Sequence, residues 1–161
     1  MSVEALVPAA PEAPAERPRR EFLTFRLGPE TYGVDILKVQ EIREIDRVTR
    51  VPHVPPYLRG VINLRGAIVP IVDLGLMLGF REPLPVEHAS AIVLNSEGRL
   101  TGLVVNGVSD VVALSDEEIR VAPDLGGRGA GSISGIGVRE EGSILLLDVA
   151  HLLGRIREER A

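Results

Sequence analysis

The 161-residue chain contains no cysteine. Disulfides, thiolate zinc sites, iron–sulfur clusters and a cysteine nucleophile are therefore excluded, and the absence agrees with a reducing compartment. No window of about 18 residues is free of charge, and the N-terminus lacks the basic-then-apolar order of a signal peptide. We therefore expect a soluble, cytoplasmic protein that does not insert into a membrane.

Aromatic side chains are also scarce, at 3% of the chain, which leaves little material for a base-stacking surface or an aromatic ligand cage. The 23 acidic and 18 basic side chains give a formal net charge of -5, so no global positive field attracts nucleic acid. We therefore expect no nucleic-acid partner.

What is abundant is valine, isoleucine and leucine in short runs, interrupted by 17 glycines and 12 prolines. This pattern favours many short strands joined by tight turns over long helices, so we predict a mostly β chain. Residues 1–20 are rich in proline and alanine, have no periodic apolar face, and are predicted to form a disordered tail.

The first half of the chain is predicted to begin with a strand from Phe22 to Leu27, where apolar and polar residues alternate. The remaining expected elements are strands at 32–34, 48–51 and 67–72, a helix from the N-cap Asp35 through Arg43, a helical turn at 56–59, and a helix from Asp73 to about Gly79. Pro70 implies that the strand at 67–72 lies at a sheet edge or contains a bulge.

The second half is predicted to contain five strands, at 89–94, 99–105, 108–114, 133–138 and 143–147. Asn106-Gly107 indicates either a hairpin turn or a bulge in one long strand, and the sequence does not decide between them. A capping box is predicted to start one helical turn at Ser115, and the glycine-rich segment at 126–131 is predicted to be a mobile loop. A helix is predicted from Asp148 through Leu153. Gly154 is expected to end it, and residues 155–161 to form a polar tail. Two sets of about five strands suggest two small closed barrels, because closure removes exposed sheet edges.

No group of residues has the spacing that bond-making chemistry requires. His53, His88 and His151 lie apart in sequence and in no metal-ligand motif. The glycines at 127, 129 and 131 precede no Lys-Ser/Thr pair and lie in no βαβ unit, so nucleotide binding is not supported. We therefore predict a protein that binds partners, is not an enzyme, and needs no metal or other cofactor.

The most distinctive segment is the apolar stretch from Gly60 to Leu74, which a single arginine, Arg65, interrupts beside Gly66. A guanidinium held at the end of a buried strand has five donors to satisfy. Either it donates to carbonyls of its own fold, or it binds a carboxylate of a partner. The residues alone leave both readings open.

Several blocks of this sequence resemble the CheW family of chemotaxis coupling proteins, in the order in which that family has them. The blocks are YGVDILKVQEIREI at 32–45, GVINLRG at 60–66, IVPIVDL at 68–74, IVLN at 92–95, GLVVNGVSDV at 102–111 and SILLLDVAHLL at 143–153. Together they cover most of the chain, which makes the resemblance far more specific than one motif.

The resemblance implies an intracellular adaptor with two five-stranded, SH3-like β-barrels that share a hydrophobic core. We expect the first barrel at about 21–85, the second at about 86–147, and a terminal helix at 148–153. Members of the family connect chemoreceptors to the histidine kinase CheA, whose regulatory domain has the same fold, and have no catalytic role. A non-flagellar chemosensory array is the alternative setting, and a small-ligand-binding barrel is a more distant one.

The resemblance also implies a receptor-binding site that takes the helical-hairpin tip of the receptor's cytoplasmic domain. The matching positions are Val39, Glu41, Gly60, Asn63, Leu64, Arg65, Gly66, Gly102, Val108 and Val111. The kinase is expected to bind an exposed, mostly apolar barrel end. No motif identifies the residues of that second contact.

Overall fold

The computed structural model describes residues 19–122 and 130–160. Its strands are β1 (Arg19–Leu27), β2 (Glu30–Asp35), β3 (Val39–Glu44), β4 (Leu58–Leu64), β5 (Ala67–Asp73), β6 (Ser90–Ser96), β7 (Arg99–Val105), β8 (Gly107–Ser115), β9 (Ile119–Val121), β10 (Ile133–Arg139) and β11 (Gly142–Leu147). Its helices are η1 (Ile36–Lys38), α2 (Leu74–Met77), η2 (Asp116–Glu118), η3 (Ala130–Ser132) and α3 (Val149–Arg160). The predicted mostly β class is confirmed.

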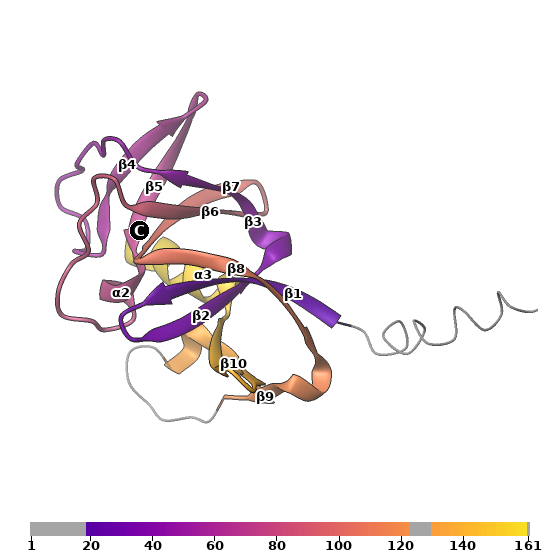
Figure 1. Cartoon of the computed structure of the whole chain (residues 1–161). Coiled ribbons are helices and arrows are strands. Elements are labelled where there is room, and N and C mark those ends of the chain that lie inside the picture. Colours follow the sequence, from indigo (N-terminus) through magenta and orange to yellow (C-terminus); the bar gives the residue numbers. More distant parts are fainter. Residues whose placement is uncertain (1–18, 123–129, 161) are drawn as a thin grey trace, which may run out of the picture.

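The strands form two sheets, which Figure 1 shows one above the other. One sheet has six strands in the order β8-β1-β2-β11-β10-β9, and the other has five in the order β3-β6-β7-β5-β4. The sheets are not successive halves of the chain, which differs from the barrels expected at about 21–85 and 86–147. The N-terminal hairpin β1–β2 joins the C-terminal strands because β2 pairs in parallel with β11, while β6 and β7 complete the sheet of β3–β5.

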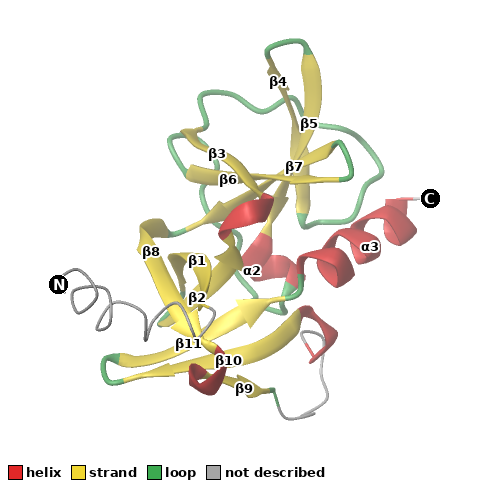
Figure 2. Cartoon of the chain, turned by 90° about the vertical axis from the view of Figure 1, so that its right-hand side faces the viewer, coloured by secondary structure: helices red, strands yellow, loops and turns green. Residues whose placement is uncertain are grey.

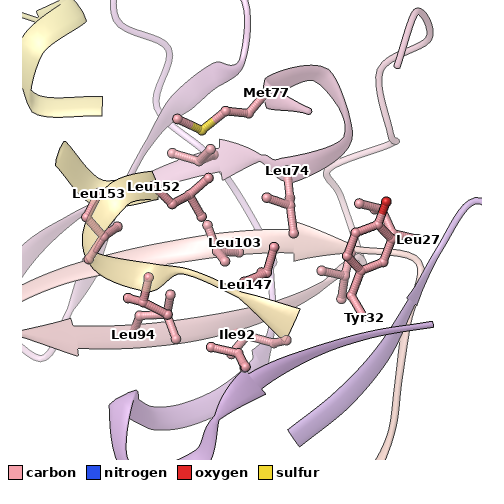
Figure 3. Packing of buried hydrophobic residues seen from close by; sticks show 14 of the residues in the cluster. Leu27, Tyr32, Leu74, Met77, Ile92, Leu94, Leu103, Leu147, Leu152 and Leu153 are labelled. Atoms are coloured by element: carbon pink, nitrogen blue, oxygen red, sulfur yellow. The ribbon is translucent and has the colours of Figure 1, made fainter. Parts of the chain in front are cut away.

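A single hydrophobic core lies between the two sheets, as expected. Its buried side chains come from β1, β2 and β11 of one sheet, from β4, β5, β6 and β7 of the other, and from α2 and α3. Figure 3 shows Leu103 of β7, Leu147 of β11 and Leu152 of α3 packed together in this core. Smaller apolar clusters lie within each sheet, around Phe22 and Leu114 in one and around Ile71 and Val104 in the other.

β1 begins at Arg19, three residues before the predicted start at Phe22. Phe22 to Phe25 are all buried rather than alternating, because Phe22 faces the cluster inside its own sheet while Leu23 and Phe25 face the shared core. The buried Thr24 hydroxyl donates to the carbonyl of Asp110 on β8, at 2.9 Å, so no hydrogen bond is lost by burying it. Residues 1–18 of the predicted tail lie outside the described residues.

Three predictions for the first half are wrong. Asp35 does cap a helical turn, accepting from the Leu37 amide at 2.9 Å, but the helix ends at Lys38 and residues 39–44 form β3. Residues 48–51 form no strand and contribute only the bridge from Thr49 to Val61. The expected helical turn at 56–59 is instead a turn that enters β4. In the first case pairing of β3 with the distant strand β6 decided the local conformation.

The second half is closer to prediction, since all five expected strands are present. Asn106-Gly107 is neither a hairpin turn nor a bulge, because the chain crosses there from β7 of one sheet to β8 of the other. The Asn106 side chain stabilises this connection by accepting a hydrogen bond from the Gly28 amide, at 2.7 Å. The short strand β9 was not predicted, and most of the 126–131 loop lies outside the described residues.

Asp148 caps α3, as predicted, by accepting from the His151 amide at 3.0 Å. The helix does not end at Gly154 but continues to Arg160, so residues 155–160 are helical rather than a tail. Burial of Ile156 in the shared core explains the extra turns, because that contact outweighs the low helix propensity of one glycine. None of the helices within 19–122 and 130–160 is long and apolar enough to span a bilayer.

Candidate partner-binding site at the β4–β5 turn

The turn between β4 and β5 is the most prominent of the sequence-predicted site segments. Leu64 pairs with Ala67, so Arg65 and Gly66 form a two-residue hairpin loop. Both have positive φ values, 52° and 93°, as a type I′ turn requires. The Asn63 side chain accepts from the Gly66 amide at 2.8 Å. Asn63 and Gly66 therefore shape the turn, and Figure 2 shows it at the end of a projecting hairpin.

Arg65 forms an ion pair with Glu41 of β3. Its side chain remains 67% exposed, whereas that of Glu41 is 25% exposed. Arg43 lies on the other side of the same carboxylate, with 3.9 Å between its Nη1 and the Oε1 of Glu41. The sequence left two readings open, donation to carbonyls of its own fold and binding of a partner's carboxylate, and the structure adds a third contact, a carboxylate of the same chain. It holds a carboxylate of its own chain and still exposes most of its guanidinium.

The other predicted site residues fall into two groups. Val39 and Val108 are partly exposed and pack against the shared core from different sheets, while Val111 is exposed on β8. Gly60, Leu64 and Gly102 are buried, as the burial patterns of β4 and β7 show. The structure therefore brings Glu41, Asn63, Arg65 and Gly66 together at the surface. Of the buried three, Leu64 directly precedes the turn, whereas Gly60 and Gly102 both lie beside Ile71 at the base of the hairpin.

Two of the buried glycines are explained by packing. Gly60 has φ +144°, and a Cβ built there would lie 2.3 Å from the carbonyl oxygen of Thr49. A Cβ at Gly102 would lie 2.8 Å from Cδ1 of the buried Ile71. Gly60 therefore needs glycine to let the backbone of Thr49 approach closely, whereas a side chain at Gly102 would displace the tip of Ile71.

An exposed apolar residue close in sequence to Val39 was missed by the sequence reasoning. Leu37 of η1 is 86% exposed, two residues before Val39. Leu37 was not singled out because residues 35–43 were predicted to be a helix whose spacing assigned the apolar face to other residues. Leu37 could have been found from the sequence as an apolar side chain in a segment too short to bury it.

The chemistry available at this site is binding chemistry. Among residues 19–122 and 130–160, no group of three His, Cys, Asp or Glu side chains is placed to hold a metal ion. The perturbed groups lie elsewhere: burial, reinforced by the charge of Glu30, raises the pKa of Tyr32, and a hydrogen bond from the Ser115 amide lowers the pKa of Glu118. The turn thus offers a shaped backbone, an exposed cation and neighbouring apolar side chains.

Comparison with known proteins shows similarity to CheW proteins across almost all of the described chain. The sequence profile of the CheW-like domain matches residues 21–157. The chain is 47% identical over 135 residues to chemotaxis protein CheW of Klebsiella aerogenes, covering 83% of this chain and 81% of that protein. It is 31% identical over 151 residues to protein FrzA of Myxococcus xanthus, covering 88% and 90%. The crystal structure of the scaffolding protein TtCheW from Thermoanaerobacter tengcongensis superposes with a TM-score of 0.77 at 27% identity, covering 84% of this chain and 92% of that one.

Proposed function

Since this chain belongs to the family of CheW-like domains and is a chemotaxis adaptor of the CheW type, we propose that it couples chemoreceptors to the histidine kinase CheA. It does so in the cytoplasm, by binding both proteins and without catalysing a reaction. The observation that supports a binding role most directly is the Arg65–Glu41 pair at an ordered surface turn, in a fold shared with the scaffolding protein TtCheW.

In the proposed contact, the Arg65–Glu41 ion pair orients the receptor, and apolar side chains supply the buried contact area. A carboxylate on the receptor's helical-hairpin tip would accept from the donors that Arg65 still exposes. Val39 and Val108, partly exposed over the shared core, would pack against the apolar face of the receptor helices. Glu41 would keep the guanidinium pointed toward the incoming partner.

The proposed kinase contact lies on a different surface, with the regulatory domain of CheA. A single adaptor can join two proteins only if the two contacts are compatible, so we place the kinase away from the β4–β5 turn. Its individual residues remain unassigned.

Isothermal titration tests the proposal directly. The purified chain should bind the regulatory domain of its cognate CheA, and separately a soluble fragment of the receptor tip, with dissociation constants up to tens of micromolar, about the order of transient signalling contacts. A third titration, with receptor fragment added to the preformed kinase complex, should also show binding. Absence of heat with both partners at these concentrations would contradict the proposal.

The alternative setting, a non-flagellar array, involves the same contacts. The similarity to protein FrzA is the observation in its favour, whereas the relatives named CheW favour chemotaxis. The two settings differ in the cognate receptors and kinase. The genes that neighbour this one, and loss of swimming chemotaxis on its deletion, separate them.

A further inference from the structure

The outer part of the β4–β5 hairpin has little support from the rest of its sheet. β7 pairs with β5 only at Ile71, Val72 and Asp73, and β4 is the outer strand of the sheet. Beyond these positions the ladder partners are within the hairpin itself, apart from the bridge between Thr49 and Val61. Figure 2 shows the hairpin projecting past the neighbouring strands. The direction of its tip therefore depends on how its base is held.

The base of the hairpin is held by a buried polar network around Asp73, the last residue of β5. The Asp73 side chain is fully buried, and its carboxylate accepts from the amides of Leu76 in α2, at 3.0 Å, and Leu84, at 2.8 Å. Its third contact is with Nη1 of Arg59 on β4, at 3.3 Å. The same Nη1 donates to the carbonyl of Leu84, at 2.7 Å.

This network joins three consecutive segments of the chain. Arg59 lies at the start of β4, Asp73 at the end of β5, and Leu84 in the connection to β6. The Arg59 side chain is only 19% exposed, so its charge and that of Asp73 neutralise each other in a largely dry setting. Because Nη1 contacts both the carboxylate and the Leu84 carbonyl, a small displacement of either strand would break one of the two contacts.

We infer that the Arg59–Asp73–Leu84 network, which we name the base clamp, sets the angle of the β4–β5 hairpin and thereby holds Arg65 against Glu41. Arg59 and Asp73 are then positioning residues for partner binding, although neither lies at the turn. This inference rests on the proposed function in one respect, that Arg65 contacts the receptor. The placement of the turn by the clamp does not depend on that role.

The test replaces Arg59 and measures both the turn and the partners. Arg59→Met keeps the apolar stem and removes the cation, whereas Arg59→Lys keeps a cation that can still donate to both acceptors. Arg99→Met removes an exposed arginine of β7 in the same sheet and is the matched control. If Arg59→Met does not fold at the assay temperature, Arg59→Gln, which retains one amide donor, takes its place.

Nuclear magnetic resonance reads the position of the turn without any partner. We expect Arg59→Met to shift the backbone amide resonances of Glu41, Arg65 and Gly66, and we expect Arg59→Lys and Arg99→Met to leave them near their wild-type positions. Unchanged resonances at these three residues in Arg59→Met would overturn the inference, whether or not the chain binds receptors.

A double-mutant cycle with Arg65 then tests the link to binding. Arg59→Met should weaken receptor-fragment binding by roughly threefold to tenfold and leave kinase binding unchanged. In an Arg65→Ala background the same change should have no further effect. The two arginines are six positions apart along extended chain, roughly 20 Å, and independent sites at that distance contribute additively.

The outcomes are distinguishable. Additive effects in the cycle, or equal losses of receptor and kinase binding that follow the unfolded fraction, would show that the clamp is only structural and overturn the inference. A wild-type chain that binds no receptor fragment would instead contradict the proposed function, and the resonance test would still decide whether the clamp places the turn.

Discussion

Arg65 and Glu41, which are 24 positions apart in sequence, form an ion pair that links the two outer strands of the five-stranded sheet. Glu41 lies in β3 and Arg65 follows β4, and these strands do not pair with each other. A surface ion pair of this kind stabilises a fold by about 0.2 to 1 kcal/mol. Its main effect is therefore to fix where the guanidinium points.

The first prediction concerns Arg65→Ala. Because the Arg65 side chain is two-thirds exposed and its ion pair contributes little stability, we expect a melting temperature near that of the wild type. Kinase binding should be retained, and receptor binding should weaken by about 2 kcal/mol as a charge-assisted contact is lost. Thermal melts and titrations with both partners are the measurements. Early melting with equal loss of both partners would show that Arg65 is a structural residue.

A charge reversal refines this prediction. The double variant Glu41→Arg with Arg65→Glu restores an ion pair of opposite polarity between the same positions. If Arg65 contacts a receptor carboxylate, the reversed pair places a negative charge there and receptor binding stays weak. Recovery of wild-type affinity in the double variant would mean that only the intramolecular pair matters.

The second prediction compares Gly60, which close packing restricts to glycine, with Gly98, which lies in an exposed turn. Gly60→Ala combines positive-φ strain with a close approach to the Thr49 backbone, so we expect a cost of about 3 kcal/mol or more in the free energy of unfolding. Gly98→Ala, in the β6–β7 turn, has φ +83° but open space around the new Cβ, and should cost only about 1 kcal/mol. Chemical denaturation measures both. Comparable costs would contradict the close packing at Gly60.

The third prediction places the start of the folded domain. Removing residues 1–18 should leave the melting temperature unchanged. Removing residues 1–20 also deletes Arg20, which lies 5.1 Å above the Phe22 ring, and Arg19, which lies 3.8 Å from Glu118. These contacts are worth about 1 kcal/mol, so the longer truncation should melt about 2 to 4 °C earlier. Equal melting of the two truncated chains would show that the first two residues of β1 contribute nothing.

The fourth prediction is a pH dependence at the capping box of η2. The Glu118 carboxylate accepts from the Ser115 amide at 2.8 Å, which lowers its pKa below the ordinary value of 4.5. Its contribution to stability is therefore fully present above pH 4.5 and is lost as the pH falls through the lower pKa of the folded state. Glu118→Gln should melt earlier than the wild type at pH 7, and the difference should shrink in acid. Glu140→Gln, an exposed change in the β10–β11 turn, is the control, and a difference that grows in acid would contradict the assignment.

Features that depend on neighbouring residues were predictable from the sequence. The caps at Asp73 and Asp148 and the boundaries of β7 follow from side chains within a few positions of each other. Arg65 and Gly66 were also identified, because an arginine and a glycine beside a buried apolar run stand out in the sequence, whereas Asn63 and Leu64 were implied by the family resemblance. The family resemblance, in turn, is carried by the order of such local blocks.

What only the tertiary structure decided involves partners far along the chain. Ile36, Val39 and Ile42 have a spacing that fits a helix, yet pairing with β6 makes residues 39–44 a strand. The pairing of β1–β2 with the C-terminal strands, the carboxylate that Arg65 binds, and the continuation of α3 beyond Gly154 all depend on contacts between segments distant in sequence. Local propensities differ by about 1 kcal/mol or less, whereas burial of one apolar side chain contributes about 1.5 to 3 kcal/mol, so contacts between distant segments override local preference.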